Sequence, residues 1–190
     1  MPLYQLPYRK SSFTEILVSS LDGHDNDLFE KQIRDHGDKQ SKKTNVKAFM
    51  TDWEMTQHEN WRELSFDIVK NGVLKLCPPV VTRQNINWGV THIWGNIYNH
   101  GDFAIDHHHL PAVWSFVYYV KVPYGSSGLM FRDLDYIVNP REGDFVLFPS
   151  HLMHGVRSNT SKEERISIAG NICQLFEIPK ENEYVYDIEA

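Results

Sequence analysis

Three consecutive histidines, His107, His108 and His109, stand in the stretch AIDHHHLPAVW. Alternate residues of a β-strand share a face and lie roughly 6.6–6.8 Å apart along the backbone. The side chains of His107 and His109 are therefore expected on one face, with His108 on the other. Two imidazoles on one face can hold a transition-metal ion, although this ligand type does not decide between iron, zinc, copper and nickel.

A third ligand is expected from the later stretch FPSHLMHGVRSN, which contains two more histidines. His151 and His154 are both candidates for this ligand, and each could instead form a hydrogen bond at the end of a strand, an alternative that fits His151 better than His154. The chain between His109 and His154 is long enough for several strands to return to one site. A histidine-rich surface loop is the simpler alternative for the first tract.

The segment RISIAGN predicts a strand in which Arg165 and Ser167 share one face. An arginine and a hydroxyl two residues apart form a site for one carboxylate. A buried arginine without an anionic partner is costly, so the interior is expected to hold both a metal and a carboxylate ligand. A surface ion pair of Arg165 with Glu163 or Asp144 is the alternative.

Strands with a period of two residues are expected to position these side chains. Short runs rich in β-branched and aromatic residues, separated by turn residues, favour an antiparallel sandwich or barrel. The predicted strands cover residues 87–99, 113–122, 127–133, 144–150 and 165–178. The polar and aromatic face of the first strand carries Trp88, Val90, His92, Trp94, Asn96 and Tyr98.

Two helices are expected to cover one outer face of this β structure. The first begins with Asn26 as its N-cap and ends at Gly37. A longer helix is predicted from about residue 52 to residue 71, because apolar residues recur there at helical spacing. Trp53 and Trp61 are expected to pin this helix to the sheet.

Length and composition favour one domain, with a helical and mixed support region (1–85), a β core (86–178) and a tail (179–190). The net charge of −6 argues against nucleic acid or an anionic membrane as a partner. Cys77 and Cys173 alone provide no disulfide framework, which fits a reducing cytoplasm. A secretion signal and a membrane span are not expected. A homodimer is left open.

The order of these motifs resembles that of the Fe(II)/2-oxoglutarate-dependent oxygenases. Within them, the sequence looks most like the prolyl-hydroxylase-like oxygenase subfamily of bacteria and phages. The resemblance covers residues 88–175 and depends on order and spacing rather than on one motif. The motifs are N-x-Y-x-x-G from Asn96, H-x-H from His107, YYV from Tyr118, G-D-F-V-L-F-P from Gly143, His154, and R-x-S from Arg165.

The resemblance implies a double-stranded β-helix (a jelly roll or cupin-like fold), mainly β with flanking α-helices. It assigns Fe(II) to His107, His109 and His154, and the distal carboxylate of the co-substrate 2-oxoglutarate to Arg165 and Ser167. Further side chains that it assigns to the co-substrate pocket are Tyr98, Tyr119 and Asn171.

The activity implied by the resemblance is that of an Fe(II)- and 2-oxoglutarate-dependent dioxygenase. Such an enzyme uses O2 to hydroxylate a peptidyl or small-molecule substrate and releases succinate and CO2. Loops 38–50, 80–87 and 132–142 are expected to contact the substrate. The expected location is the cytoplasm, which would be that of the host if a phage encodes the protein.

One position departs from the widespread family motif His-x-Asp/Glu, because His109 replaces the carboxylate. A His-x-Asp sequence nearby, from His100 to Asp102, ranks second as the ligand pair. The alternative function is a cupin-like three-His metal-binding protein that does not use 2-oxoglutarate. A third possible function is that of an inactive jelly roll that serves in an assembly. The pairing of Arg165 with Ser167 argues against both, because neither needs a carboxylate site.

Overall fold

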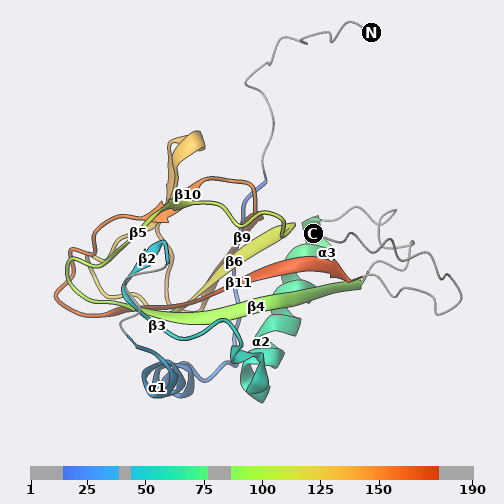
Figure 1. Cartoon of the computed structure of the whole chain (residues 1–190), viewed down its shortest axis with the longest axis horizontal. Coiled ribbons are helices and arrows are strands. Elements are labelled where there is room, and N and C mark those ends of the chain that lie inside the picture. Colours follow the sequence, from blue (N-terminus) through green and yellow to red (C-terminus); the bar gives the residue numbers. More distant parts are fainter. Residues whose placement is uncertain (1–14, 39–43, 77–86, 176–190) are drawn as a thin grey trace, which may run out of the picture.

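The chain folds into two antiparallel sheets that face each other, as a computed structural model shows for residues 15–38, 44–76 and 87–175 (Figure 1). The larger sheet consists of β1 (Leu17–Ser20), β3 (Phe49–Met50), β4 (Asn87–Tyr98), β6 (Trp114–Lys121), β9 (Asp144–Pro149) and β11 (Arg165–Leu175). Its strand order is β1-β9-β6-β11-β4-β3.

The smaller sheet closes the other side of the sandwich. It consists of β2 (Val46–Lys47), β5 (Phe103–His107), β7 (Leu129–Phe131), β8 (Tyr136–Val138) and β10 (His154–Val156). Its strand order is β2-β5-β10-β7-β8. The prediction of a double-stranded β-helix with flanking helices is confirmed.

Helices cover the outer face of the larger sheet, as expected (Figure 1). They are α1 (Asn26–His36), the 3-10 turn η1 (Met55–Gln57), α2 (Glu59–Ile68), the π turn η2 (Val69–Val73) and α3 (Leu74–Leu76), and the 3-10 turn η3 (Arg132–Leu134) lies apart from them. The end of α1 at Gly37 is confirmed. Its N-cap is Asp25 rather than Asn26, because the Asp25 carboxylate accepts the Leu28 N–H at 2.9 Å.

The predicted continuous helix from residue 52 to residue 71 is wrong at its start. Backbone hydrogen bonds hold this part of the chain beside β4, where Thr51 N–H donates to the Gly95 carbonyl and Ile93 N–H donates to the Trp53 carbonyl. An extended backbone at these positions cannot also form helical hydrogen bonds. The α-helix therefore begins only at Glu59.

The two faces of the larger sheet carry different kinds of side chain. Ile166 and Ile168 face the helices and form part of an apolar core with them. Gly95 allows α1 to approach β4, since a Cβ atom there would lie 2.3 Å from Ile33 Cγ1. Arg165 and Ser167 alternate with these isoleucines and face the smaller sheet. The interior between the sheets thus receives the polar residues of β11.

The two tryptophans predicted to pin α2 behave differently. Trp61 is fully buried, and its Nε1 donates to Gln32 Oε1 of α1 at 2.7 Å. The prediction holds for Trp61 and is wrong for Trp53, whose side chain is 50% exposed and precedes the helix.

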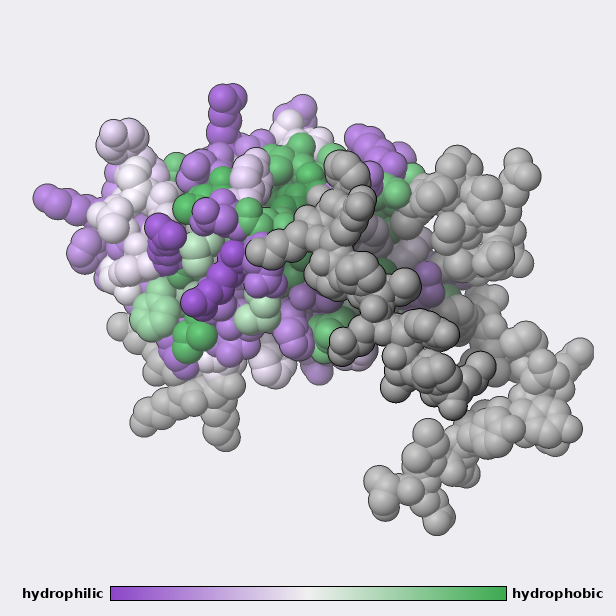
Figure 2. Space-filling model, turned by 90° about the horizontal axis from the view of Figure 1, so that it is seen from above, coloured by the Kyte–Doolittle hydropathy of each residue, from purple (hydrophilic) through white to green (hydrophobic). Residues whose placement is uncertain are grey.

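Within residues 15–38, 44–76 and 87–175, no helix is both long enough and apolar enough to cross a bilayer. Figure 2 shows the side on which β5 and β10 lie, where apolar residues gather near the middle and hydrophilic residues surround them. Phe103 and Ile105 are the large apolar residues exposed on β5.

Candidate metal centre and adjoining pockets

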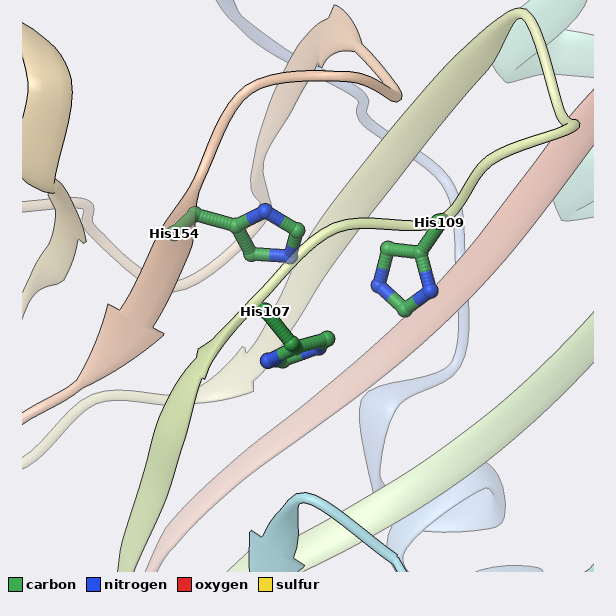
Figure 3. A group of neighbouring side chains, drawn as sticks. All are labelled: His107, His109 and His154. Carbon is green, nitrogen blue, oxygen red and sulfur yellow. The ribbon is translucent and has the colours of Figure 1, made fainter.

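Three histidine rings converge between the sheets (Figure 3). His107 ends β5, His109 follows it after one residue, and His154 begins β10 opposite His107. Their ring centroids lie 4.6–5.0 Å apart. One nitrogen from each ring lies within 4.8 Å of the others. His108 is exposed, so the alternation expected for the three consecutive histidines is confirmed.

Backbone hydrogen bonds orient two of the rings. The Nδ1 atom of His107 lies 2.6 Å from the Ile105 carbonyl oxygen, and that of His154 lies 2.8 Å from the Leu152 carbonyl oxygen. Because a carbonyl oxygen can only accept, each Nδ1 carries the proton. The Nε2 atoms of both rings are therefore unprotonated, and their lone pairs can coordinate a metal ion.

The protonation state of the rings also suits a metal ion. Burial lowers the pKa of His107, and it lowers the pKa of His154 to about 4 and that of His109 to about 3. Neighbouring imidazoles add to the effect on His109 and His154. All three rings are therefore neutral near pH 7, and a metal ion displaces no proton from their ligand atoms.

A narrow inner pocket of about 40 Å³ leads from the three histidines to Arg165. The Arg165 side chain is 1% exposed, and its Nη1 donates to Ser167 Oγ at 3.3 Å. Its Nε and Nη2 atoms are buried without a partner among the described residues. The surface pairing with Glu163 or Asp144 is thus wrong, since Arg165 is buried and forms no ion pair in the described structure.

Two tyrosines flank this guanidinium group. Its central carbon lies 4.9 Å from the ring centroid of Tyr98 and 5.1 Å from that of Tyr119. Both side chains are buried, and burial raises the pKa of Tyr98 and raises that of Tyr119 to about 12. Both phenols are therefore neutral at pH 7. The Tyr119 hydroxyl and Asn96 Oδ1 are buried and have no partner among the described residues.

A wider cleft of about 330 Å³, the outer cleft, also borders His107 and His109. The described residues that line it are Thr44, Asn45, Val46, Met50, Trp53, His92, Trp94, His107, His109 and Asn171. Asn171 therefore lines this outer cleft, and it is not among the residues that line the inner pocket with Arg165.

The loops expected to contact substrate meet this cleft to different extents. Residues 44–50 of the first loop contribute to its wall, whereas none of its described lining residues comes from 132–142. Residues 80–86 of the remaining loop lie outside the described residues.

The second-ranked ligand pair does not form a metal centre. Asp102 accepts hydrogen bonds from the backbone and side-chain nitrogens of Asn99 at 2.8 and 3.2 Å and so holds the turn between β4 and β5. Gly101 occupies this turn with φ +89°, a conformation that favours glycine. The Nδ1 atom of His100 contacts the Ser161 carbonyl oxygen instead. These residues shape the turn that leads into the ligand strand.

Three residues of the two pockets were not singled out as site residues from the sequence. His92, Trp94 and Asn96 line the pockets from β4. They share the strand face of Tyr98, which the resemblance assigned to the co-substrate pocket, so the two-residue period of the strand could have identified them. Residues 44–50 belong to the loop 38–50, which was expected to contact the substrate from its position alone.

The donor atoms fit Fe(II) and 2-oxoglutarate. Three neutral imidazoles, from the neighbouring strands β5 and β10 and from the segment that follows β5, suit a divalent transition metal and leave coordination positions open. Arg165 offers unpartnered N–H groups at the end of a buried pocket, where a carboxylate would satisfy them. The buried Tyr119 hydroxyl is a further unpaired polar group next to Arg165.

Comparisons with known proteins point the same way. A family described as "Putative 2OG-Fe(II) oxygenase" matches residues 134–171, which include His154, Arg165 and Ser167. None of the curated proteins searched matches the sequence.

Among solved structures, similar chains have the same fold at low sequence identity. Viral collagen prolyl hydroxylase from Paramecium Bursaria Chlorella virus-1 is 14% identical, with a TM-score of 0.59 over 85% of this chain and 96% of that chain. A Pseudomonas putida prolyl-4-hydroxylase is 15% identical, with a TM-score of 0.61 over 85% and 94%. HygX from Streptomyces hygroscopicus, solved with nickel and 2-oxoglutarate, is 12% identical, with a TM-score of 0.61 over 86% and 84%.

At these identities the structural likeness establishes the fold alone. The family match adds sequence evidence for the segment that carries the last histidine and the arginine. Together they confirm the resemblance of this chain to the Fe(II)/2-oxoglutarate-dependent oxygenases, and its fold is also that of the prolyl hydroxylases among the solved structures.

Proposed function

We propose that the protein is an Fe(II)- and 2-oxoglutarate-dependent dioxygenase that hydroxylates a peptidyl or small-molecule substrate in the cytoplasm. His107, His109 and His154 would hold the iron. Arg165 and Ser167 would bind the distal carboxylate of 2-oxoglutarate, beside Tyr98 and Tyr119. Bound Fe(II) and 2-oxoglutarate supply the oxidative chemistry with O2, and succinate and CO2 are the by-products.

The observation that carries this proposal is the buried Arg165 guanidinium. Arg165 is only 1% exposed, yet two of its nitrogens have no partner among the described residues. A charged group in such a position is costly unless a ligand of opposite charge completes it. Because its pocket also reaches His107, His109 and His154, one dicarboxylate can contact both ends. A three-His protein that does not use 2-oxoglutarate has no need of this arginine.

Each protein group has a defined task in this proposal. The carbonyl oxygens of Ile105 and Leu152 keep the Nδ1 protons of His107 and His154 in place, so that Nε2 faces the metal. Tyr98 and Tyr119 hold the guanidinium between their rings and exclude water from the carboxylate. The substrate would approach from the outer cleft, since that cleft also borders His107.

The test is the conversion of 2-oxoglutarate to succinate by the purified protein with Fe(II), O2 and a pool of synthetic peptides. We expect succinate from the wild type and at least a hundredfold less from His107→Ala and from Arg165→Met. The matched control His108→Ala alters the exposed member of the histidine tract and should remain active. Bound iron without any succinate would instead favour the cupin-like metal-binding protein.

A further inference from the structure

Asn171 is held against the outer cleft by two buried hydroxyl groups. Ser115 Oγ donates to Asn171 Oδ1 at 3.0 Å, and the hydroxyls of Ser115 and Ser150 lie 2.7 Å apart. Ser115 and Ser150 are 1% and 0% exposed. Because Ser115 gives its proton to Asn171, Ser150 must give its own to Ser115. This chain of hydrogen bonds fixes which end of the Asn171 amide faces the cleft.

The Asn171 nitrogen is the end that remains available. Within residues 15–38, 44–76 and 87–175, no acceptor is found for its Nδ2 atom, which is also not among the buried unpartnered atoms. It therefore presents N–H groups to the cleft beside His92, its cross-strand neighbour on β4. An amide N–H in this position suits a neutral oxygen acceptor.

The described lining of the rest of the cleft is uncharged and partly aromatic. Its described lining includes neither an acidic side chain nor a lysine or arginine. Trp94 forms one wall against His109, with ring centroids 5.6 Å apart, and Trp53 is half exposed. Among the described lining residues, a charged substrate group would find no side chain of opposite charge for an ion pair. The volume of about 330 Å³ suits a ligand of drug-like size.

We propose that the outer cleft binds an uncharged peptide segment and that Asn171 Nδ2 donates a hydrogen bond to one of its carbonyl oxygens. Ser115 and Ser150 are positioning residues for Asn171, and Trp53 offers an apolar surface to the segment. This inference rests on the proposed function, since His107 and His109 at the end of the cleft would hold the iron.

The experiment measures peptide binding to the protein loaded anaerobically with Fe(II) and 2-oxoglutarate, with the visible charge-transfer band as proof of loading. The probes are three pools of N-acetylated, C-amidated tetrapeptides, which are neutral, acidic and basic. Binding is followed by the quenching of tryptophan fluorescence, because Trp53 and Trp94 line the cleft. We expect the neutral pool to bind at least tenfold more tightly than either charged pool.

Variants of the hydrogen-bond chain separate recognition from folding. Asn171→Asp keeps the acceptor for Ser115 but removes the N–H donor, and it should weaken neutral-pool binding by about tenfold or more. Ser115→Ala should weaken it about threefold by releasing the Asn171 amide. Cys173→Ala, a control on the same strand, should bind as the wild type does. All variants should show the wild-type band.

The results distinguish this inference from the proposed function. If the wild-type protein shows no band, the proposed function is wrong. If the band forms but charged pools bind as tightly as the neutral pool, or no pool binds, only the inference about the cleft is wrong. Unchanged neutral-pool binding by Asn171→Asp would also overturn it.

Discussion

Replacement of Arg165 by methionine should raise or preserve the stability of the ligand-free protein. Arg165 is 1% exposed, and the one hydrogen bond that its guanidinium forms with the described residues, to Ser167, is 3.3 Å long. A buried polar group without a partner costs about 1–3 kcal/mol, and more if it is charged. Contacts with the rings of Tyr98 and Tyr119 offset about 2 kcal/mol. The free energy of unfolding should therefore change by about −1 to +1 kcal/mol, and it should rise further because the guanidinium is charged.

The same substitution should strongly weaken the binding of 2-oxoglutarate. Loss of one partner of a buried, hydrogen-bonded charge pair costs about 2–5 kcal/mol. This free energy corresponds to a roughly thirtyfold to several-thousandfold higher dissociation constant. If ligand-free Arg165→Met is at least as stable as the wild type but binds 2-oxoglutarate much more weakly, then Arg165 serves ligand binding rather than the stability of the fold.

The assays are urea unfolding of the metal-free protein and calorimetric titration of the Fe(II)-loaded protein with 2-oxoglutarate under anaerobic conditions. Arg132→Met is the matched control, because Arg132 is 69% exposed and pairs with Asp106 on the surface. It should leave the affinity for 2-oxoglutarate unchanged. The reasoning is refuted if Arg165→Met unfolds several kcal/mol more easily and still binds 2-oxoglutarate with wild-type affinity.

Three further predictions concern the metal centre and the packing of the fold. His107→Ala should lose stoichiometric Fe(II) in anaerobic calorimetry, whereas His108→Ala should retain it; equal loss in both would argue against the triad. Burial lowers the pKa of His154 to about 4, so the unfolded chain takes up protons first as the pH falls below 6.5. Urea unfolding of the metal-free protein should therefore show stability decreasing from pH 7 to pH 5, and a decrease that is equally steep in His154→Ala would contradict this cause. Gly95→Ala should lower the free energy of unfolding by about 1–3 kcal/mol, since its Cβ would lie 2.3 Å from Ile33 Cγ1; an unchanged urea midpoint would show that α1 moves away freely.

The sequence predicted best those features that depend on local periodicity. The opposite orientations of His107 and His108 follow from the two-residue period of a strand, and the structure has them. The same period placed Arg165 and Ser167 on one face of β11. His154 could be proposed as the third ligand only because its stretch supplied histidines, since its pairing with β5 is a long-range contact.

The features that the sequence did not predict depend on distance and tertiary pairing. Six residues along a strand span about 20 Å, and Asn171 lines the outer cleft rather than the inner pocket that Arg165 lines. The register of β11 also shifts after Asn171. Trp53 has the spacing of a helix residue, yet its carbonyl accepts the Ile93 N–H and keeps it beside β4. Such pairings override local propensity and leave no periodic signal.

The most direct test of the central claim is an anaerobic absorbance titration of the metal-stripped protein with Fe(II) and then 2-oxoglutarate. We expect a visible charge-transfer band with equimolar 2-oxoglutarate. The band should be lost in His107→Ala and should appear in Arg165→Met only at much higher 2-oxoglutarate concentrations. Iron binding without such a band, or a band unaffected by Arg165→Met, would contradict the claim that the triad and Arg165 form one site.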